Sequence, residues 1–189
     1  MIAASGSSRG EDGTVPVGPL WRGRRQVHLI GFMGSGKSAV GRLLARRLVW
    51  NYLDLDALIV RHVGKPVAAI FADDGEAEFR RQESWVLRQA THKPRCVLAL
   101  GGGTTLDPDN RKLCERTAVT VWLRCPLELI CDRLAAGSTE RPLWASDLRI
   151  EDLFVARQPI YSLARHVVDA TGSPDEVAAA IEELLLATR

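Results

Sequence analysis

Short apolar runs alternate along the chain with longer segments in which apolar residues recur at helical spacing. The apolar runs occur at 27–30, 52–54, 96–100, 119–123 and 167–169, and each is followed by a turn and then by a helix or a basic loop. This alternation is typical of a parallel β-sheet that helices cover on both faces. We therefore expect an α/β fold with three α/β/α layers and a five-stranded parallel sheet.

Residues 1–25 differ from the rest of the chain, because they are rich in Gly, Ser, Pro and Arg and show no periodic apolar pattern. They lack the apolar core of a secretory signal. Three arginines near their end would suit an organelle transit peptide, whereas two acidic residues before them and the short length count against one. We expect a disordered leader, followed by a single domain at 26–189.

The composition points to one ordinary domain that binds neither nucleic acid nor membrane. The 189 residues are 46% hydrophobic and 25% charged, and the net charge is +2. There is no basic stripe with interleaved aromatic residues, and no apolar run approaches the ~20 residues of a membrane span. Cys96, Cys114, Cys125 and Cys131 lack C-x-x-C spacing, which favours reduced thiols in a cytoplasmic protein.

The octapeptide at 31–38, Gly-Phe-Met-Gly-Ser-Gly-Lys-Ser, matches the phosphate-loop (Walker A) pattern G-x-x-x-x-G-K-[ST] between a strand and a helix. The backbone N–H groups of such a loop and the helix dipole attract phosphates, Lys37 adds a positive charge, and Ser38 can ligate Mg²⁺. The alternative is a glycine-rich turn that merely holds a lysine. The predicted nucleotide-binding residues of the loop are Gly34, Ser35, Gly36, Lys37, Ser38 and Ala39.

Two acidic residues, Asp54 and Asp56, end the second predicted strand and project to the same side if the backbone stays extended. One carboxylate can then hold Mg²⁺ through water, while the other orients the hydroxyl that attacks the γ-phosphate. The alternative is a pair of acidic caps for the next helix. No aspartate directly follows the runs at 96–100 and 119–123, so Asp54 is the expected metal carboxylate. The absence of an N-K-x-D motif argues against a GTPase.

Two further features predict an acceptor pocket. The run Gly101-Gly102-Gly103 follows an apolar strand, where the absence of side chains lets a ligand approach backbone N–H groups. Arg80 and Glu83 lie one turn apart on a helix expected at 76–89, so that Glu83 can orient Arg80 for bidentate recognition of a carboxylate. The alternatives are a tight turn and a solvated ion pair.

A polar stretch at 137–143, between two predicted helices, contains Arg141 followed by a proline and can close over phosphates. Arg133 on the preceding helix and Arg157 further along complete a set of arginines that a phosphoryl-transfer site would use. Taken singly, each of these arginines is more often a surface residue.

In this order the motifs resemble those of shikimate kinases, from residue 27 to the last helix. The resemblance rests on the phosphate loop, Asp54-Leu55-Asp56, Phe79-Arg80 with Glu83, the glycine run, Arg141-Pro142-Leu143, and Arg157 with Pro159 and Tyr161. It implies a P-loop kinase fold like that of nucleoside monophosphate kinases, with a substrate-binding segment at about 56–90 and a mobile lid at about 137–149. It also implies transfer of the ATP γ-phosphate to the 3-hydroxyl of shikimate, giving shikimate 3-phosphate and ADP on the route to chorismate and the aromatic amino acids.

The resemblance assigns roles to the candidate residues. Asp54 and Ser38 would hold Mg²⁺, Arg133 would pack near adenine, and Arg141 would come from the lid to the ATP phosphates. Catalysis would depend on Lys37, Asp56 and Arg141, and a monomer is expected. Shikimate would be bound by Asp56, Arg80, Glu83, Gly101, Gly102, Gly103 and Arg157. The chain departs from the commonest family pattern at Val49-Trp50, where small residues are usual, and at Thr171-Gly172-Ser173-Pro174, which lacks the basic character often seen beside adenine.

Two other functions remain open at this point. One is another small-molecule kinase of the same fold, such as a gluconate or nucleotide kinase, against which Asp56, Arg80 and Arg157 argue together. The other is a shikimate-kinase-like binding protein without activity. The catalytic and metal residues that the chain retains argue against this second function.

Overall fold

The computed structural model describes residues 26–137 and 150–187. The predicted leader at 1–25 lies outside these residues, and so does the predicted lid beyond Gly137, including Arg141. Within the described residues, no helix is long and apolar enough to cross a membrane.

The centre of the fold is one sheet of five parallel strands in the order β2-β3-β1-β4-β5. Each strand begins and ends within one residue of its predicted position, so the prediction of a five-stranded parallel sheet is confirmed. The strands are β1 (Gln26–Ile30), β2 (Asn51–Asp54), β3 (Cys96–Ala99), β4 (Val119–Arg124) and β5 (His166–Asp169).

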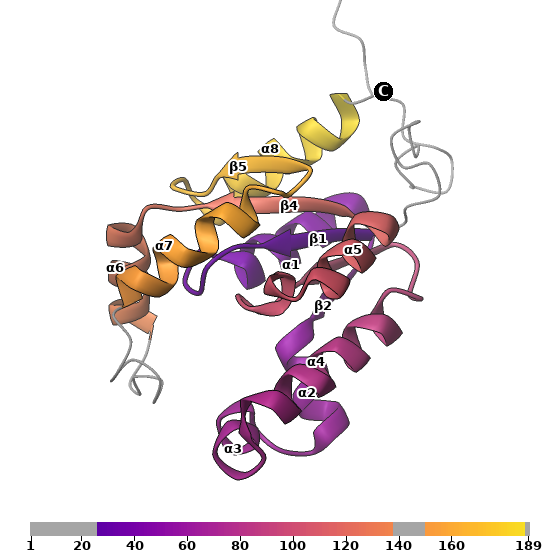
Figure 1. Ribbon diagram of the computed structural model, residues 1–189. Coiled ribbons are helices and arrows are strands. Elements are labelled where there is room, and N and C mark those ends of the chain that lie inside the picture. The colour runs from indigo at the N-terminus through magenta and orange to yellow at the C-terminus, as the bar shows by residue number, and fades with distance from the viewer. Residues whose placement is uncertain (1–25, 138–149, 188–189) are drawn as a thin grey trace, which may run out of the picture.

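Helices cover both faces of this sheet, which gives the three predicted layers. Helices α1 and α8 pack together on one face, while α5 and α7 lie on the other (Figure 1). The strands β1 and β3 are fully buried between these layers, as expected of a parallel sheet covered on both sides. The helices are α1 (Lys37–Leu48), α2 (Leu55–Val63), α3 (Val67–Asp73), α4 (Gly75–Ala90), α5 (Pro108–Thr117), α6 (Leu127–Gly137), α7 (Ile150–Tyr161) and α8 (Pro174–Ala187), with a 3₁₀ helix η2 (Thr104–Leu106).

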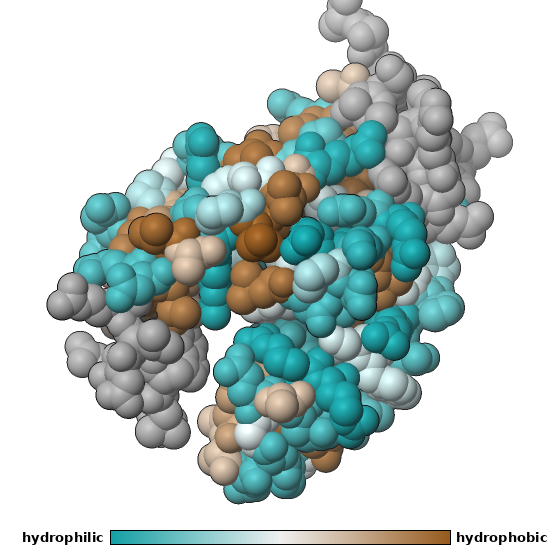
Figure 2. Space-filling model, in the orientation of Figure 1, coloured by the Kyte–Doolittle hydropathy of each residue, from teal (hydrophilic) through white to brown (hydrophobic). Residues whose placement is uncertain are grey.

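Helices α2, α3 and α4 pack on one another and project from the β2 edge of the sheet (Figure 1). Figure 2 shows that the surface is hollowed where they meet the rest of the molecule. Helix α4 matches the helix predicted at 76–89 and has one additional residue at each end. These helices carry Arg80 and Glu83, so their placement decides whether the predicted acceptor residues reach the phosphate loop.

Hydrogen bonds between Ser173 and Glu176 define the start of helix α8. Pro174 is its first residue, the Ser173 backbone N–H donates to Glu176 Oε2 at 2.8 Å, and the Glu176 N–H donates to Ser173 Oγ at 3.3 Å. This is a capping box, which satisfies N–H groups that a helix start leaves unpaired. It fixes the start of α8 and with it the loop that follows β5.

Candidate active site

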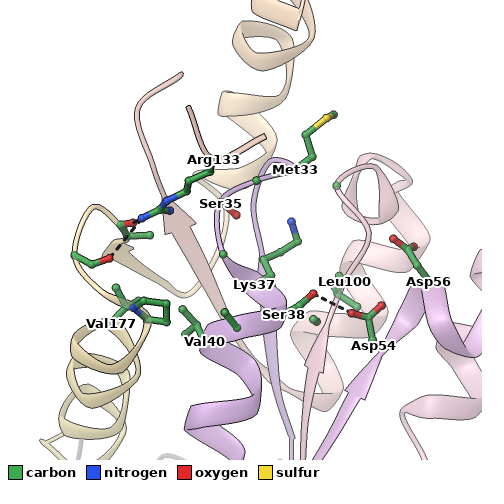
Figure 3. A pocket seen from close by; sticks show the side chains of 18 residues that line it. Met33, Ser35, Lys37, Ser38, Val40, Asp54, Asp56, Leu100, Arg133 and Val177 are labelled. Carbon is green, nitrogen blue, oxygen red and sulfur yellow. Dashed lines mark hydrogen bonds between the residues drawn. The ribbon is translucent and has the colours of Figure 1, made fainter. Parts of the chain in front are cut away.

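A cavity of about 460 Å³ opens beyond the carboxyl ends of the strands, which is where open α/β sheets bind their ligands. Figure 3 shows Lys37 in its middle, with Arg133 on one side and Asp54 and Asp56 on the other. Its lining includes every predicted nucleotide-binding residue that the structure describes. The lining residues are Met33, Gly34, Ser35, Gly36, Lys37, Ser38, Ala39, Val40, Asp54, Asp56, Ala99, Leu100, Gly102, Arg133, Ala170, Gly172, Pro174 and Val177.

The phosphate loop runs from β1 into α1, as its motif requires. Gly36 caps α1 in a left-handed conformation, with φ of 93°, which only glycine adopts without strain. Lys37 Nζ donates to the carbonyls of Gly31 at 2.9 Å and Phe32 at 2.8 Å, so the side chain curves back over the loop. Burial lowers the pKa of Lys37 to about 8, although the nearby carboxylates of Asp56 and Asp54 oppose this shift. The lysine is therefore still a cation at neutral pH.

The backbone does not stay extended between Asp54 and Asp56, so the condition for both side chains to project to one side of a strand is not met, and the alternative of an acidic helix cap is present at Asp54. Helix α2 begins at Leu55, and Asp54 is its N-cap, with Oδ1 accepting the Ala57 N–H at 3.3 Å. An aspartate at this position satisfies an N–H group at the helix start, and the helix dipole favours the acidic Asp56 in the first turn. Both carboxylates nevertheless line the cavity (Figure 3). Asp54 is thus both a helix cap and a candidate metal ligand.

The donors around Asp54 fit a magnesium ion. Ser38 Oγ donates to Asp54 Oδ2 at 3.0 Å, so a hydroxyl and a carboxylate stand side by side at the foot of the phosphate loop. Mg²⁺ prefers oxygen ligands and is usually held by one or two protein groups together with phosphate oxygens and water. The pair Ser38 and Asp54 supplies this donor set.

Asp56 has the electrostatic surroundings of a group that can take up a proton. Its side chain still contacts solvent at the mouth of the cavity. Desolvation by the cavity lining and the negative charges of Asp54 and Glu83 nevertheless raise the pKa of Asp56 to about 6. Lys37 and Arg80 act in the opposite direction. A carboxylate whose pKa lies near neutral pH is suited to general base catalysis.

Each residue of the glycine run makes room for a predicted functional side chain. A Cβ on Gly101 would lie 3.0 Å from both Asp56 Oδ1 and Glu83 Oε1. On Gly102 it would lie 3.3 Å from Arg157 Nη1, and on Gly103 it would lie 2.7 Å from Arg80 Nη1. The run therefore brings together four side chains from three helices, which the sequence alone did not indicate.

The predicted pair of Arg80 and Glu83 is present, and it is not a solvated surface pair. Arg80 Nη1 donates to Glu83 Oε2 at 2.7 Å, and the Glu83 side chain is only 1% exposed. The other Glu83 oxygen accepts the hydroxyl of Thr104 on η2 at 2.6 Å. Thr104 was missed by the sequence analysis, because no local pattern links residues 21 positions apart.

Arg157 reaches the same loop from α7 on the opposite side. Its guanidinium lies 5.6 Å from the centre of the Phe32 ring, and its Nε is buried without a hydrogen-bond partner among the described residues. Tyr161, which belongs to the same motif as Arg157, donates its hydroxyl to the Gly102 carbonyl, so both residues lie against Gly102. A buried, unpaired guanidinium N–H beside an open cavity is suited to an anionic ligand.

Arg133 joins α6 to the loop before α8. Its Nη2 donates to the carbonyls of Ala170 at 3.0 Å and Gly172 at 3.5 Å. Pro174 and Val177 line the cavity nearby, so that this side offers an apolar surface beside a planar cation. The sequence predicted Arg133 but missed Val177, which as a single apolar residue in a helix carries no distinguishing pattern.

Comparison with known proteins agrees with this geometry. The sequence model of the shikimate kinase family matches residues 33–186. The chain belongs to the shikimate kinase family. A relative named shikimate kinase, from Geobacter metallireducens, is 44% identical over 161 residues, which cover 83% of this chain and 89% of the relative. A second, from Salinibacter ruber, is 38% identical over 173 residues, covering 86% of this chain and 85% of the relative.

A solved shikimate kinase also matches the fold. The structure from Acinetobacter baumannii, determined in complex with shikimate, superposes with a TM-score of 0.81 at 32% identity and covers 90% of this chain and 97% of that one. The predictions of the shikimate kinase family, of its kinase class and of its α/β/α fold are therefore confirmed. Membership of this family favours a shikimate kinase over the gluconate and nucleotide kinases considered above.

Proposed function

We propose that this shikimate kinase family member binds ATP over the phosphate loop and shikimate over the glycine run, and transfers the γ-phosphate to the 3-hydroxyl of shikimate. The observation that carries the proposal is the convergence of two guanidinium groups, Arg80 and Arg157, on the loop beside the phosphate-binding cavity. Two arginines from opposite sides are suited to hold a carboxylate. Shikimate has a carboxylate, gluconate presents its carboxylate differently, and the nucleotide acceptor of a nucleotide kinase lacks one.

In this proposal the phosphates of ATP lie against the loop N–H groups at 34–39 and against Lys37. Arg133, Pro174 and Val177 would contact the adenine base. Ser38 and Asp54 would hold Mg²⁺, which would neutralise charge on the phosphates. Arg141, which lies outside the described residues, is proposed to reach the phosphates from a lid at about 137–149.

Asp56 is proposed to act on the acceptor hydroxyl. It would accept the hydrogen bond of the 3-hydroxyl and take up its proton as the oxygen forms a bond to the γ-phosphorus. The bond between that phosphorus and the oxygen bridging to the β-phosphate breaks, and ADP leaves. Glu83 and the glycine run would hold Arg80 and Arg157 so that the hydroxyl is directed at the phosphate.

The test is an ADP-release assay with shikimate, gluconate and AMP as acceptors. We expect turnover with shikimate and at most background with the other two. Arg80→Lys keeps the charge but loses the two-pronged contact, so the KM for shikimate should rise about 10- to 150-fold, which corresponds to about 1.5 to 3 kcal/mol. Arg81→Lys on the same helix is the matched control, because Arg81 is 68% exposed and pairs with Glu78 away from the glycine run; it should behave as wild type. Equal effects of the two substitutions, or preference for another acceptor, would contradict the proposal.

We also propose that the protein works as a monomer in the cytoplasm. The phosphate loop, Asp54, Asp56 and Arg133 line one cavity, and Arg80 and Arg157 approach the glycine run beside it, so a single chain can supply the described site residues, which supports a monomer. The cysteines, which are free thiols in the described residues, support a reducing compartment such as the cytoplasm. Light scattering at working concentrations would test the first point, since a stable dimer would double the mass.

A further inference from the structure

The half-buried Tyr52 lies next to the candidate metal site, although nothing in the proposed reaction uses it. It is on β2, two residues before Asp54, and its hydroxyl donates to Asp54 Oδ2 at 3.0 Å. The same carboxylate oxygen accepts the Ser38 hydroxyl at 3.0 Å. Asp54 Oδ2 therefore receives two hydroxyl groups, one from α1 and one from its own strand.

Helix α1 is shaped to receive the Tyr52 ring. Gly41 faces the ring, and a Cβ at that position would lie only 2.7 Å from Tyr52 Cε2 and 3.1 Å from Cδ2. The Arg42 guanidinium lies 5.2 Å from the ring centre. The ring is thus packed against α1, and packing fixes the direction in which its hydroxyl points.

Taken together, these contacts hold both oxygens of the Asp54 carboxylate. Its Oδ1 accepts the Ala57 N–H at the start of α2, and its Oδ2 accepts the two hydroxyls. Among the described residues, Ser38 would be the one side-chain donor left to Oδ2 without Tyr52, and Ser38 is itself a candidate ligand of the ion. A metal-binding carboxylate is commonly oriented by a neighbouring donor of this kind, and its removal typically costs about 10- to 100-fold in metal affinity or activity.

We infer that Tyr52 is a positioning residue for the magnesium site, whose hydroxyl holds the Asp54 carboxylate in the orientation that Mg²⁺ with bound nucleotide requires. This inference rests on the proposed function, because that function places magnesium at Ser38 and Asp54. It predicts a defect that depends on the metal and that leaves the nucleotide contacts of the phosphate loop intact.

Tyr52→Phe is the discriminating variant, since it keeps the ring against Gly41 and removes only the hydroxyl. ADP affinity is measured by calorimetry at a series of Mg²⁺ concentrations and again with EDTA. We expect the Mg²⁺ concentration that gives half of the full gain in ADP affinity to rise about tenfold, with ADP affinity in EDTA unchanged. Saturating Mg²⁺ should restore wild-type affinity.

Arg42→Gln is the matched control, because Arg42 contacts the same ring without touching Asp54; its Mg²⁺ dependence should match that of wild type. In an Asp54→Asn background, Tyr52→Phe should have no further effect on Mg²⁺ dependence, since the residue it positions is gone. If Tyr52→Phe matches wild type, or loses ADP affinity equally in EDTA, the inference is wrong. If wild type itself shows no Mg²⁺ dependence, the proposed metal site is wrong instead.

Discussion

The substitution Gly103→Ala should weaken shikimate binding without damaging the fold. Gly103 has φ of −103° and ψ of −11°, which alanine adopts without strain, so the backbone tolerates the change. The new Cβ would lie 2.7 Å from both terminal nitrogens of Arg80 and 2.9 Å from its Cζ. These atoms must therefore move.

The size of the effect follows from these distances. Non-bonded heavy atoms settle at about 3.5 Å or more, so the guanidinium must retreat by roughly 0.8 Å. The Arg80 side chain is 32% exposed and can shift, but Glu83 holds it at 2.7 Å and limits where it can go. Since a misplacement of about 1 Å can lower turnover by about 10²-fold, we expect kcat/KM for shikimate to fall between about 10- and 100-fold. ATP affinity should stay within about twofold of wild type.

Calorimetry with shikimate and with ATP, together with a thermal unfolding scan, measures these quantities separately. The decisive comparison uses an Arg80→Ala background, which removes the three atoms that lie nearest to the added methyl group. There Gly103→Ala should cost nothing further. If it still lowers shikimate affinity tenfold, the glycine acts through the loop backbone, and our account of the close approach is refuted.

Three other predictions concern pH and stability. Because Asp56 must be ionised to accept a proton and its pKa is raised to about 6, kcat/KM should fall about tenfold per unit below pH 6; a profile that stays flat down to pH 4.5 would contradict the base assignment. Burial lowers the pKa of His28 in β1 from 6.5 to about 3, so the unfolded chain takes up a proton there that the folded protein refuses, and stability should be lost as pH falls below 6.5. The loss from this residue is about 2 kcal/mol at pH 5, and urea unfolding at pH 7 and 5 should show a smaller loss in His28→Gln. Val49 has φ of 54° at the end of α1 and is 63% exposed, so Val49→Gly should stabilise the protein by about 1 kcal/mol, whereas Val155→Gly at a helical position that is 67% exposed should destabilise it by about 0.4 kcal/mol.

The sheet could be predicted closely because its strands are apolar runs bounded by turns. Burial between two helical layers requires such runs, so the pattern and the structure have one cause. The same logic failed between Asp54 and Asp56. Strand β2 is at the edge of the sheet, and there the N-capping preference of Asp54 starts a helix one residue later, which the strand pattern did not reveal.

The site could be predicted only where its residues lie close together in the sequence at a spacing that indicates their chemistry. The phosphate loop is contiguous, and Arg80 and Glu83 lie three residues apart on one helix, so both were found. The contact of Tyr52 with Gly41 and the orientation of Arg157 by Phe32 depend on how α1, β2 and α7 pack, and no spacing encodes them. The departure from the family pattern at Val49-Trp50 likewise had no explanation in the sequence. In the structure Val49 is a left-handed residue at the end of α1, which explains why a small residue would suit that place.

The relative placement of the two substrate arginines depends on the glycine loop more than on either helix alone. Glu83 accepts hydrogen bonds both from Arg80 and from Thr104, which follows the run directly. At the middle of the run, the Gly102 carbonyl accepts the hydroxyl of Tyr161, one helical turn after Arg157. Two hydrogen-bonded contacts thus join α4 and α7 to the same short loop. Because the phosphate loop is held by separate contacts, loosening either one should raise the KM for shikimate and leave ATP binding unchanged.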